Sequence, residues 1–369
     1  MLQTCGVQEH VTNRLDPKAE SAKWLAGIVG ENPSKFAKSP SIWNPVLQGL
    51  EIDAFYSPFD VEAKQLARFV EAARQEERLK GFSVTMPYKV SIIPLLDEVD
   101  PKAAAIGAVN IVVRTRHGRL IGANTDGSGA SASLTTSLTG AVAPYFTTLA
   151  GCNALLIGAG GAGKAIAWYL AEAIGTGRLY IATRDRRSGG ALCQALRDAG
   201  SSVVWIEETV IQEVAPSVQL VINATTKGQS GIRTLPGGRI TCLEPYSALA
   251  PANPASFPAS DATDQAKFHM AWARASRTDL LVNLDRSAQL MAAIPTSVSF
   301  MDIIYSPFES AMLQQARLSG HRTLNGKGMN ICQAADALFH WVFQDWLKRK
   351  GLYKPATYQD IVERMCAVW

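Results

Sequence analysis

The sequence has little of what marks several large classes of protein. Its 369 residues include five histidines and six cysteines. No two cysteines form a CxxC pair, and none lies at metal-ligand spacing from a histidine. A chain of this length can build a hydrophobic core without disulfides, so we expect reduced thiols and no metal site. The cysteines are Cys5, Cys152, Cys193, Cys242, Cys332 and Cys366.

Concentrated charge and long apolar runs are also missing. The net charge is +4, and the lysines and arginines are scattered instead of forming one stripe, so we expect no nucleic-acid partner. The longest apolar runs fall well short of the ~18 residues that span a bilayer. The first twenty residues lack the apolar core of a signal peptide. These absences favour a cytoplasmic protein that binds a small molecule and no membrane, and they leave its oligomeric state open.

What the sequence does contain is a regular alternation of short apolar runs and amphipathic segments. This pattern predicts an α/β protein with mostly parallel sheets. We expect a polar arm at 1–22, a first α/β unit from Trp24, and a second α/β unit that begins near Cys152. Within it, residues 231–297 are rich in Pro, Ala and Ser and break the pattern, which indicates an insertion.

A glycine-rich turn follows the apolar segment NALLIG and precedes an amphipathic segment. Gly158, Gly160 and Gly163 have the GxGxxG spacing. The first glycine allows a tight turn, the second lets the backbone approach a pyrophosphate, and the third lets helix and strand pack closely. A helix that begins here directs its free N–H groups at the phosphates. We therefore expect Gly161 and Ala162 to bind a dinucleotide together with the three glycines.

The end of the next predicted strand decides which dinucleotide binds. NAD sites place a carboxylate there for the ribose hydroxyls. Here Thr183 and Arg184 come first, and Arg187 follows. Guanidinium groups suit the additional phosphate of NADP, which this sequence favours. Asp185 keeps NAD as an alternative, and a solvated basic loop without a cofactor role is a third interpretation.

Two polar groups stand at the ends of apolar segments and suggest catalysis. Lys89 follows GFSVTMPY, and Asp126 closes the cluster Asn124-Thr125-Asp126. Oxidation of an alcohol needs a group that takes the hydroxyl proton while hydride leaves the carbon. A lysine whose charge is balanced by a carboxylate can perform this task. A structural Lys89–Asp126 ion pair at a domain hinge fits the spacing equally well.

Six short motifs, taken in order, resemble the shikimate/quinate dehydrogenase family. The resemblance implies a substrate-binding α/β domain at 23–125, completed by 328–369, a Rossmann-like NADP or NAD domain at 126–327, and a cleft between them for a cyclic hydroxy acid. It covers about seven-tenths of the chain. The motifs are VTMPYK at 84–89, IGAVN at 106–110, GANTDG at 122–127, GAGGAGKAI at 158–166, INATTKG at 222–228 and GMNICQAA at 328–335.

The resemblance also implies roles for individual residues. Lys89 and Asp126 match the catalytic lysine and aspartate of an NADP-dependent enzyme that reversibly oxidises a ring hydroxyl of shikimate. The positions that match binding residues are Thr85, Asn110 and Gln333 for the ring hydroxyls, Tyr305 for the cleft, Thr225 and Gly328 for the nicotinamide side, and Thr183 and Arg184 for the adenosine phosphate.

The chain departs from the family pattern where the substrate carboxylate is expected to bind. The family usually has two hydroxyl residues there, and this chain has Ala37 and Ser39. Ser83 stands where an asparagine is common, and Trp43 where a histidine is frequent. We keep Ser39 and Ser83 as expected substrate contacts. Residues that could replace the missing hydroxyl are Ser34, Lys35 and Lys38.

These departures leave more than one function open. They can be tolerated changes in a shikimate dehydrogenase, or they can mark a specialised enzyme for quinate or an amino analogue. A ligand-sensing relative without turnover is a further alternative, although a sensor has no need to keep both Lys89 and Asp126. A reductase that shares only the dinucleotide fold is disfavoured by the motifs VTMPYK and GANTDG.

Overall fold

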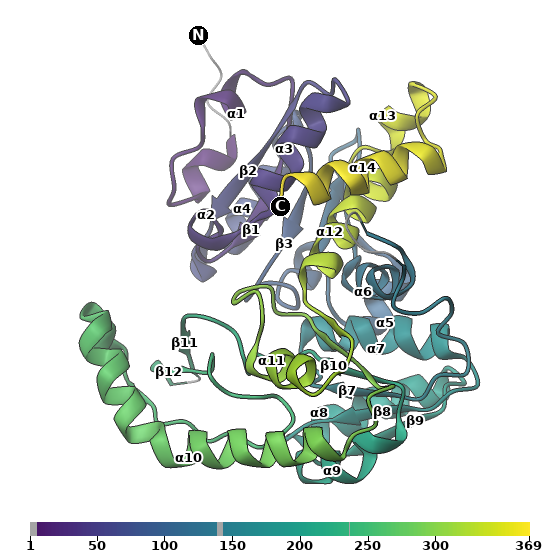
Figure 1. Cartoon of the computed structure of the whole chain (residues 1–369). Coiled ribbons are helices and arrows are strands. Elements are labelled where there is room, and N and C mark those ends of the chain that lie inside the picture. Colours follow the sequence, from purple (N-terminus) through teal and green to yellow (C-terminus); the bar gives the residue numbers. More distant parts are fainter. Residues whose placement is uncertain (1–5, 139–142, 236) are drawn as a thin grey trace. The chain divides into compact units, whose positions relative to one another are not determined.

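The computed structural model describes residues 6–138, 143–235 and 237–369. The chain forms two compact units (Figure 1). The first unit comprises Met1–Pro144, Lys164–Ile166 and Met329–Trp369, and the second comprises Tyr145–Gly163 and Ala167–Gly328. Within the described ranges, no helix combines the length and apolar character that a membrane crossing requires.

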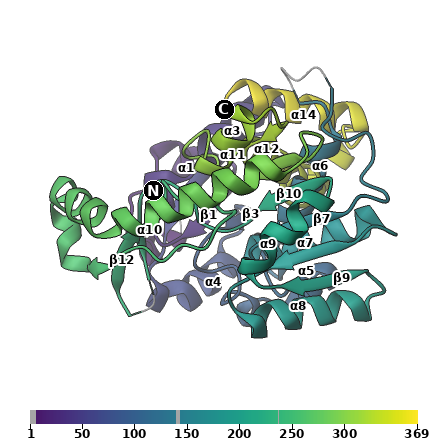
Figure 2. The same ribbon diagram turned by 60° about the horizontal axis from the view of Figure 1, so that its bottom comes forward.

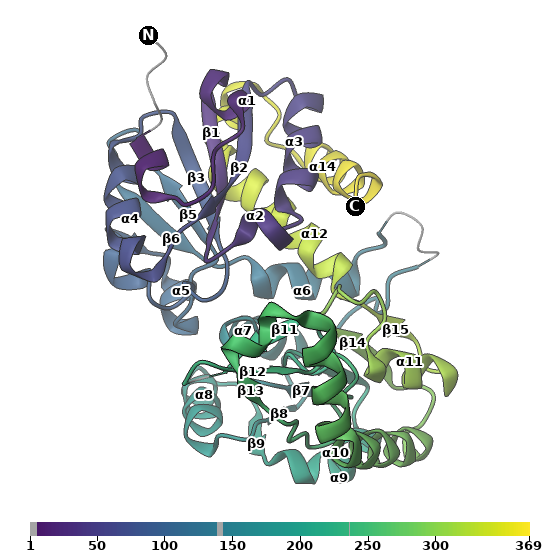
Figure 3. The same cartoon turned by 90° about the vertical axis from the view of Figure 1, so that its left-hand side faces the viewer.

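The first unit is built on a six-stranded mixed sheet with the order β2-β1-β3-β5-β6-β4 (Figure 3). Strands β1, β2 and β3 are parallel, and β5 is antiparallel to both of its neighbours. The strands are β1 (Trp24–Gly30), β2 (Ala54–Asp60), β3 (Leu79–Val84), β4 (Glu98–Val99), β5 (Ile111–Arg114) and β6 (Leu120–Ala123).

Two hydrophobic clusters form the core of this unit. One includes Trp43, Tyr56 and Phe343, and the other includes Phe59 and Phe82. Tyr56 and Phe59 lie on the same strand, so β2 contributes side chains to both clusters. The helices of the unit are α1 (Pro17–Ser21), α2 (Pro33–Phe36), α3 (Ser39–Gly49), α4 (Leu66–Gln75), α5 (Pro101–Ile106), α6 (Asp126–Thr135), α12 (Lys327–Asp336, from Met329), α13 (Gln344–Arg349) and α14 (Pro355–Ala367).

The N-terminal segment differs from the expected polar arm. Residues 1–5 lie outside the described ranges, but 6–22 fold as part of the first unit. Val7 of the short helix η1 (Gly6–His10) and Leu15, which lies between η1 and α1, are part of the core, with exposed fractions of 0% and 2%. These apolar residues are separated by polar ones, so the sequence shows no periodic pattern that would reveal the packing.

The first unit also extends further than the predicted boundary at residue 125. Its continuous part runs to Pro144 and includes α6. The reason is close packing between α6 and α12. A Cβ added to Gly129 would stand 2.6 Å from the backbone nitrogen of Gln333, so only a glycine lets the two backbones approach this closely.

The second unit, whose strands β10, β7 and β9 are labelled in Figure 2, contains a parallel six-stranded sheet with the order β15-β14-β10-β7-β8-β9. Read from β9, this is the strand order of doubly wound dinucleotide-binding folds. The predicted Rossmann-like architecture is therefore confirmed. Its elements are β7 (Ala154–Ile157), α7 (Gly161–Ile174), β8 (Leu179–Ala182), α8 (Arg186–Asp198), β9 (Val203–Ile206), α9 (Ile211–Val214), β10 (Leu220–Asn223), β14 (Ser299–Asp302), α11 (Ala311–Leu318) and β15 (Thr323–Leu324).

The segment 231–297 is largely ordered. Its three short antiparallel strands precede one helix of 29 residues, which is the long green helix in Figures 1 and 3. Tyr246, Phe268 and Trp272 form a small core of their own, and Leu290 and Met291 pack into the main core of the second unit. The elements are β11 (Ile232–Thr234), β12 (Arg239–Cys242), β13 (Phe257–Pro258) and α10 (Gln265–Ala293).

Candidate active site

Strand direction gathers the predicted catalytic residues at one edge of the first sheet. Strands β1, β2, β3 and β6 all end at this edge, and β5 begins there because it is antiparallel to β3 and β6. Ser83 is paired with Ile111, which is paired with Ala123. The residues just beyond these positions, Asn110 and Asp126 among them, are therefore held as neighbours by the sheet.

Lys89 and Asp126 form an ion pair at this edge, with 2.6 Å between Nζ and Oδ2. The Asp126 side chain is 7% exposed and the Lys89 side chain 20%. Asp126 is the first residue of α6, where the positive end of the helix dipole stabilises a carboxylate. The aspartate is thus held inside the protein, while the lysine retains access to a ligand.

Asn110 connects this ion pair to the rest of the site. Its Nδ2 donates to Oδ1 of Asp126 at 2.8 Å, so each carboxylate oxygen has one strong donor. Its Oδ1 accepts from the backbone N–H of Thr125 at 2.8 Å. The Asn110 amide also contacts Gln333 Oε1 at 3.3 Å, and the Thr125 hydroxyl donates to the Gln333 carbonyl at 3.0 Å. The predicted residues Lys89, Asp126, Asn110 and Gln333 therefore form one connected network.

The loop that carries Lys89 is fixed by its backbone at both ends. The N–H of Thr85 donates to the Val29 carbonyl at 2.9 Å, and the Lys89 carbonyl accepts from Val109 at 2.8 Å. Between them, the Tyr88 hydroxyl donates to the Val61 carbonyl at 2.5 Å. The backbone position from which the Lys89 side chain extends is therefore fixed.

The departures from the family pattern lie together in the same unit. Ser83 accepts a hydrogen bond from the hydroxyl of Tyr56 at 2.8 Å, and the Tyr56 ring stacks on Trp43 with centroids 4.6 Å apart. Ser34, a possible substitute for the missing hydroxyl, is already bonded to both carboxylate oxygens of Asp60 through its backbone N–H and its hydroxyl. Tyr56 was missed in the sequence because a tyrosine within a strand carries no motif.

In the second unit, the three glycines of the turn have the geometry that their expected tasks require. Gly158 has φ +104°, which permits the turn after β7. A Cβ on Gly163 would lie 2.4 Å from the Gly158 carbonyl oxygen, so helix and turn pack too closely for a side chain. A Cβ on Gly160 would meet no described heavy atom within 4 Å, which leaves this backbone open to a ligand.

The loop after β8 uses two of its polar groups internally. Asp185 accepts from the backbone N–H groups of Arg187 and Ser188 as the N-cap of α8. Hydrogen bonds from the Ser188 side chain and from these N–H groups lower the pKa of Asp185. The Thr183 hydroxyl donates to the Asp185 carbonyl and accepts from Nε1 of Trp205, both at 2.9 Å. Within the described residues, no carboxylate forms an ion pair with Arg184 or Arg187, and both are exposed.

The expected nicotinamide-side residue Thr225 belongs to a buried network of the second unit. Its hydroxyl donates to Oδ1 of Asn223 at 2.7 Å, and Nδ2 of Asn223 donates to both carboxylate oxygens of Asp302. Burial raises the pKa of Asp302 to about 6. Burial also raises the pKa of Tyr305, which follows β14. Gly328 lies at the start of α12 and is the last residue of this unit.

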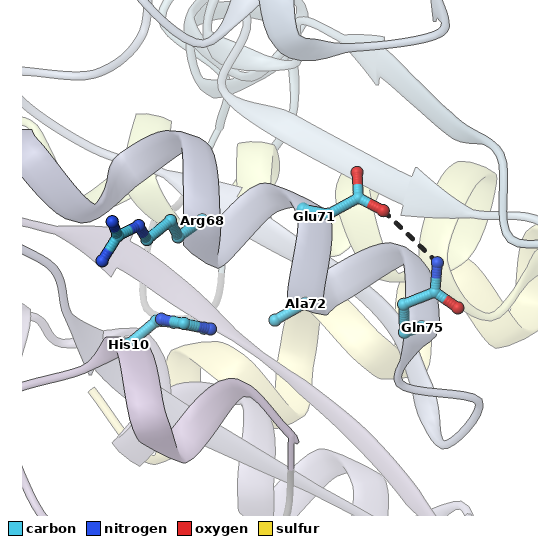
Figure 4. Close-up of a pocket in the computed structure, with 5 residues that line it drawn as sticks. All are labelled: His10, Arg68, Glu71, Ala72 and Gln75. Carbon is cyan, nitrogen blue, oxygen red and sulfur yellow. Dashed lines mark hydrogen bonds between the residues drawn. The ribbon is translucent and has the colours of Figure 1, made fainter.

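A surface depression of about 270 Å³ lies elsewhere on the first unit, between η1 and α4 (Figure 4). It contains none of the predicted site residues. Its one hydrogen bond among the drawn residues joins Gln75 to Glu71 at 3.3 Å. The lining residues are His10, Arg68, Glu71, Ala72 and Gln75.

Comparisons with known proteins agree with the motif pattern. Residues 28–112 match the family model described as the shikimate dehydrogenase substrate binding domain. A curated protein of Bacillus licheniformis named shikimate dehydrogenase (NADP(+)) is 32% identical over 319 residues, which span 86% of this chain and 91% of that protein. The chain belongs to the shikimate/quinate dehydrogenase family. The predicted family and the predicted class, an NAD(P)-dependent oxidoreductase, are thereby confirmed.

Solved structures of the shikimate/quinate dehydrogenase type share the fold. Quinate dehydrogenase from Corynebacterium glutamicum, in complex with NAD, gives a TM-score of 0.66 at 24% identity and covers 94% of this chain and 98% of its own. The ligand-free 5-ketofructose reductase of Gluconobacter sp. strain CHM43 gives a TM-score of 0.59 at 25% identity, with 93% and 99% covered. The fold is therefore shared by proteins that are named for different substrates.

Proposed function

We propose that the protein catalyses the reversible, NADP-dependent oxidation of a ring hydroxyl of shikimate, and in the other direction the reduction of 3-dehydroshikimate. The observation that carries this proposal is the Lys89–Asp126 pair at 2.6 Å, joined by Asn110 to Gln333 at one edge of the first sheet. The assignment of the shikimate dehydrogenase name to relatives that share most of this chain supports the choice of substrate.

Lys89 moves the proton in this mechanism. As the alcohol is oxidised, its O–H bond breaks and the neutral amine of Lys89 takes the proton, while hydride leaves the same ring carbon. In the reverse direction the ammonium returns that proton to the carbonyl oxygen. Asp126 orients Lys89 and stabilises its charged form, because its Oδ2 lies 2.6 Å from Nζ. When bound, NADP supplies the group that accepts or donates the hydride.

The neighbouring side chains provide ring-hydroxyl recognition. Asn110 and Gln333 present amide groups beside the ion pair, and an amide can both donate to and accept from a hydroxyl. Thr85 lies four residues before Lys89 on the loop that the sheet fixes. Three contacts that converge near the lysine favour a rigid polyhydroxylated ring over a simple alcohol.

The second unit suits NADP. The Gly160 backbone is open to a ligand, and α7 begins at the next residue with its free N–H groups. The carboxylate of Asp185 is used as a helix cap, which removes the acceptor that NAD sites place beside the ribose. Arg184 and Arg187 remain available for the additional phosphate.

A second candidate substrate is quinate. Ala37 cannot donate a hydrogen bond to a carboxylate, and Ser83 is shorter than the asparagine usual in the family, so the ring can bind in a shifted position. The quinate dehydrogenase that shares this fold is consistent with that alternative. A sensor without turnover is disfavoured because the Lys89–Asp126 pair is intact.

Steady-state oxidation tests the proposal. Shikimate and quinate are offered with NADP and with NAD, 5-ketofructose is offered with NADPH and with NADH, and reduced nicotinamide is followed by its absorbance. We expect turnover of shikimate with NADP, and a fall in kcat of about 10²- to 10⁴-fold in Lys89→Met, which removes the proton-transfer group.

Lys64→Met is the matched control. Lys64 belongs to the same unit and also forms an ion pair, with Glu62 at 2.8 Å, but its side chain is 77% exposed. We expect this variant to keep wild-type activity. Turnover of quinate alone would assign the second candidate. A Lys89→Met enzyme that retains wild-type kcat would refute the role of the lysine.

A further inference from the structure

Three hydroxyl groups from three elements of the first unit meet at Tyr56. The Tyr56 hydroxyl, on β2, donates to Oγ of Ser83, on β3, at 2.8 Å. A side-chain hydrogen bond with Ser39, at the start of α3, lowers the pKa of that same hydroxyl against the larger effect of burial. Ser39 is the hydroxyl residue that remains of the family's usual two, and Ser83 stands where an asparagine is common.

The ring of Tyr56 has almost no freedom to move. The residue is 1% exposed, and its ring stacks on Trp43 at an interplanar angle of 29°. Its backbone is held from both sides by the Asn44 amide, whose Nδ2 donates to the Tyr56 carbonyl at 3.0 Å while Oδ1 accepts from the Tyr56 N–H at 2.8 Å. Burial raises the pKa of Tyr56, so the hydroxyl keeps its proton and remains a donor.

We propose that Tyr56 is a positioning residue that joins Ser39 and Ser83 into one hydroxyl relay and thereby couples two substrate contacts. The proposal rests on the proposed function, because it takes both serines to touch the cyclic acid. Tyr56 itself is buried and need not contact the substrate. Its influence passes through the two serine hydroxyls.

The chemistry of hydroxyl groups gives the relay its consequence. Each hydroxyl has one proton to donate, so in a chain of three each proton fixes the direction of the next bond. In this structure Tyr56 donates to Ser83, which leaves the Ser83 proton for an oxygen of the ligand. If the ligand instead takes the Ser39 proton, as a carboxylate would, Tyr56 can turn its own proton to Ser39. Ser83 then donates to Tyr56, and its oxygen is left to accept from the ligand. What binds at one serine therefore decides which role the other can take.

This coupling selects ligands by their pattern of donors and acceptors. A ring acid that presents an acceptor at one serine and a hydroxyl donor at the other satisfies the whole chain. Two acceptors, or two donors, leave one bond of the relay unmade. Shikimate and quinate differ in the substitution of the ring carbon that carries the carboxylate, so the relay is a device that can distinguish them.

The test uses Tyr56→Phe, which keeps the stacked ring and removes only the hydroxyl. For wild type and this variant, kcat and KM are measured with shikimate and with quinate. Loss of a neutral hydrogen bond predicts that KM rises about three- to tenfold while kcat changes less than about twofold. Ser39→Ala, Ser83→Ala and their combination are then measured in both backgrounds. We expect their effects on KM to be non-additive with Tyr56 present and additive with Phe at this position.

Tyr353→Phe is the matched control. Tyr353 belongs to the same unit, its ring stacks on Phe339 with centroids 4.5 Å apart, and its hydroxyl is bonded to Nδ1 of His340 at 2.8 Å. It touches neither serine, so its loss should leave KM unchanged. An unchanged KM in Tyr56→Phe, or equal additivity of the serine variants in both backgrounds, would overturn the relay.

A calorimetric titration separates this proposal from the proposed function. If the wild type turns over neither acid, the proposed function fails, and both acids are titrated into wild type and Tyr56→Phe without cofactor. Weaker binding of either acid to the variant supports the relay even then. Equal affinities, or no binding to either protein, contradict it.

Discussion

The replacement Asp126→Asn isolates the contribution of the negative charge beside Lys89. The two side chains have nearly the same shape, so packing is preserved. Asp126 accepts from Lys89 through one carboxylate oxygen and from Asn110 through the other, at 2.6 and 2.8 Å. An amide has one oxygen and one NH₂ group, so whichever way it turns, one of these two donors faces another donor.

The size of the effect follows from the charge-assisted bond that is lost. Such a bond contributes about 1.5–3 kcal/mol, which corresponds to a fall in kcat/KM of about 10- to 150-fold. The Lys89 side chain keeps 20% of its surface exposed, so its ammonium can turn to water. We therefore expect the variant to fold, and to lose less than the about 3–5 kcal/mol that breaking a fully buried pair costs.

The assay is steady-state oxidation, with thermal unfolding of each variant measured in parallel. Lys89→Met and the Lys89→Met, Asp126→Asn double variant complete the cycle. If Asp126 acts through Lys89, the second change costs almost nothing once the lysine is gone. A folded Asp126→Asn enzyme within about threefold of wild-type kcat/KM would refute the orienting role, and so would additive losses in the double variant.

Three further predictions concern the cofactor loops and Lys80, a lysine with a lowered pKa. Arg184→Ala should reduce the ratio of NADP to NAD affinity by about 10- to 100-fold, measured by titration with each dinucleotide, since it removes a charged hydrogen-bond donor; an unchanged ratio would assign the phosphate to other groups. Gly160→Ala should weaken NADP binding at least tenfold and leave the unfolding midpoint unchanged. Gly163→Ala should destabilise the fold by about 1–3 kcal/mol, because its Cβ would stand 2.4 Å from the Gly158 carbonyl oxygen. Loss of stability in Gly160→Ala together with an unchanged unfolding midpoint in Gly163→Ala would contradict these assigned tasks. Burial, and then repulsion by Arg114 and other cations, lowers the pKa of Lys80 to about 8. Below that pH the folded state contains an ammonium that its surroundings disfavour, and it regains stability as the pH rises toward the ordinary lysine pKa. Lys80→Met removes this titration together with the contact between Nζ and the Trp24 ring, whose centroid is 3.3 Å away. We expect the stability of this variant relative to wild type to fall as the pH rises from about 8 toward the ordinary lysine pKa, and a constant difference across this range would refute it.

The parts of the site that the sequence revealed are those encoded locally. Lys89 and Asp126 lie in short motifs at the ends of strands, and the alternation of elements predicts that parallel strands end at one edge. The glycine turn is likewise a local pattern, because Gly158 has a positive φ, Gly160 faces open space and a Cβ on Gly163 would meet the Gly158 carbonyl oxygen.

The parts that the sequence did not reveal depend on contacts between distant residues. The Thr183 hydroxyl was expected to face the cofactor, but Trp205, which is 22 residues away, donates to it, and its own proton goes to Asp185. Whether the Thr183 hydroxyl is available to a cofactor depends on the pairing of β8 with β9, which carries Trp205, and the motif does not encode that pairing. The Tyr56 relay is of the same kind, since its three hydroxyls come from separate elements.

The helix α10 was hidden for a different reason. Its buried positions include Ser276, Asn283 and Ser287 as well as apolar residues, so hydrophobic periodicity is weak. Asn283 Nδ2 donates to the carbonyls of Ser247, Ala250 and Pro251, which anchors the Pro-rich segment to the helix. A helix that packs through hydrogen bonds shows no apolar stripe in the sequence.

The most direct test of the account follows the transferred hydrogen itself. Shikimate that carries deuterium on the ring carbon of the reacting hydroxyl is incubated with the wild-type protein and NADP, and the nicotinamide product is examined by mass spectrometry. We expect deuterated NADPH together with the ring ketone, and initial rates of both that are about 10²- to 10⁴-fold lower with Lys89→Met. NADPH without deuterium, or deuterium transfer by Lys89→Met at the wild-type rate, would contradict this mechanism.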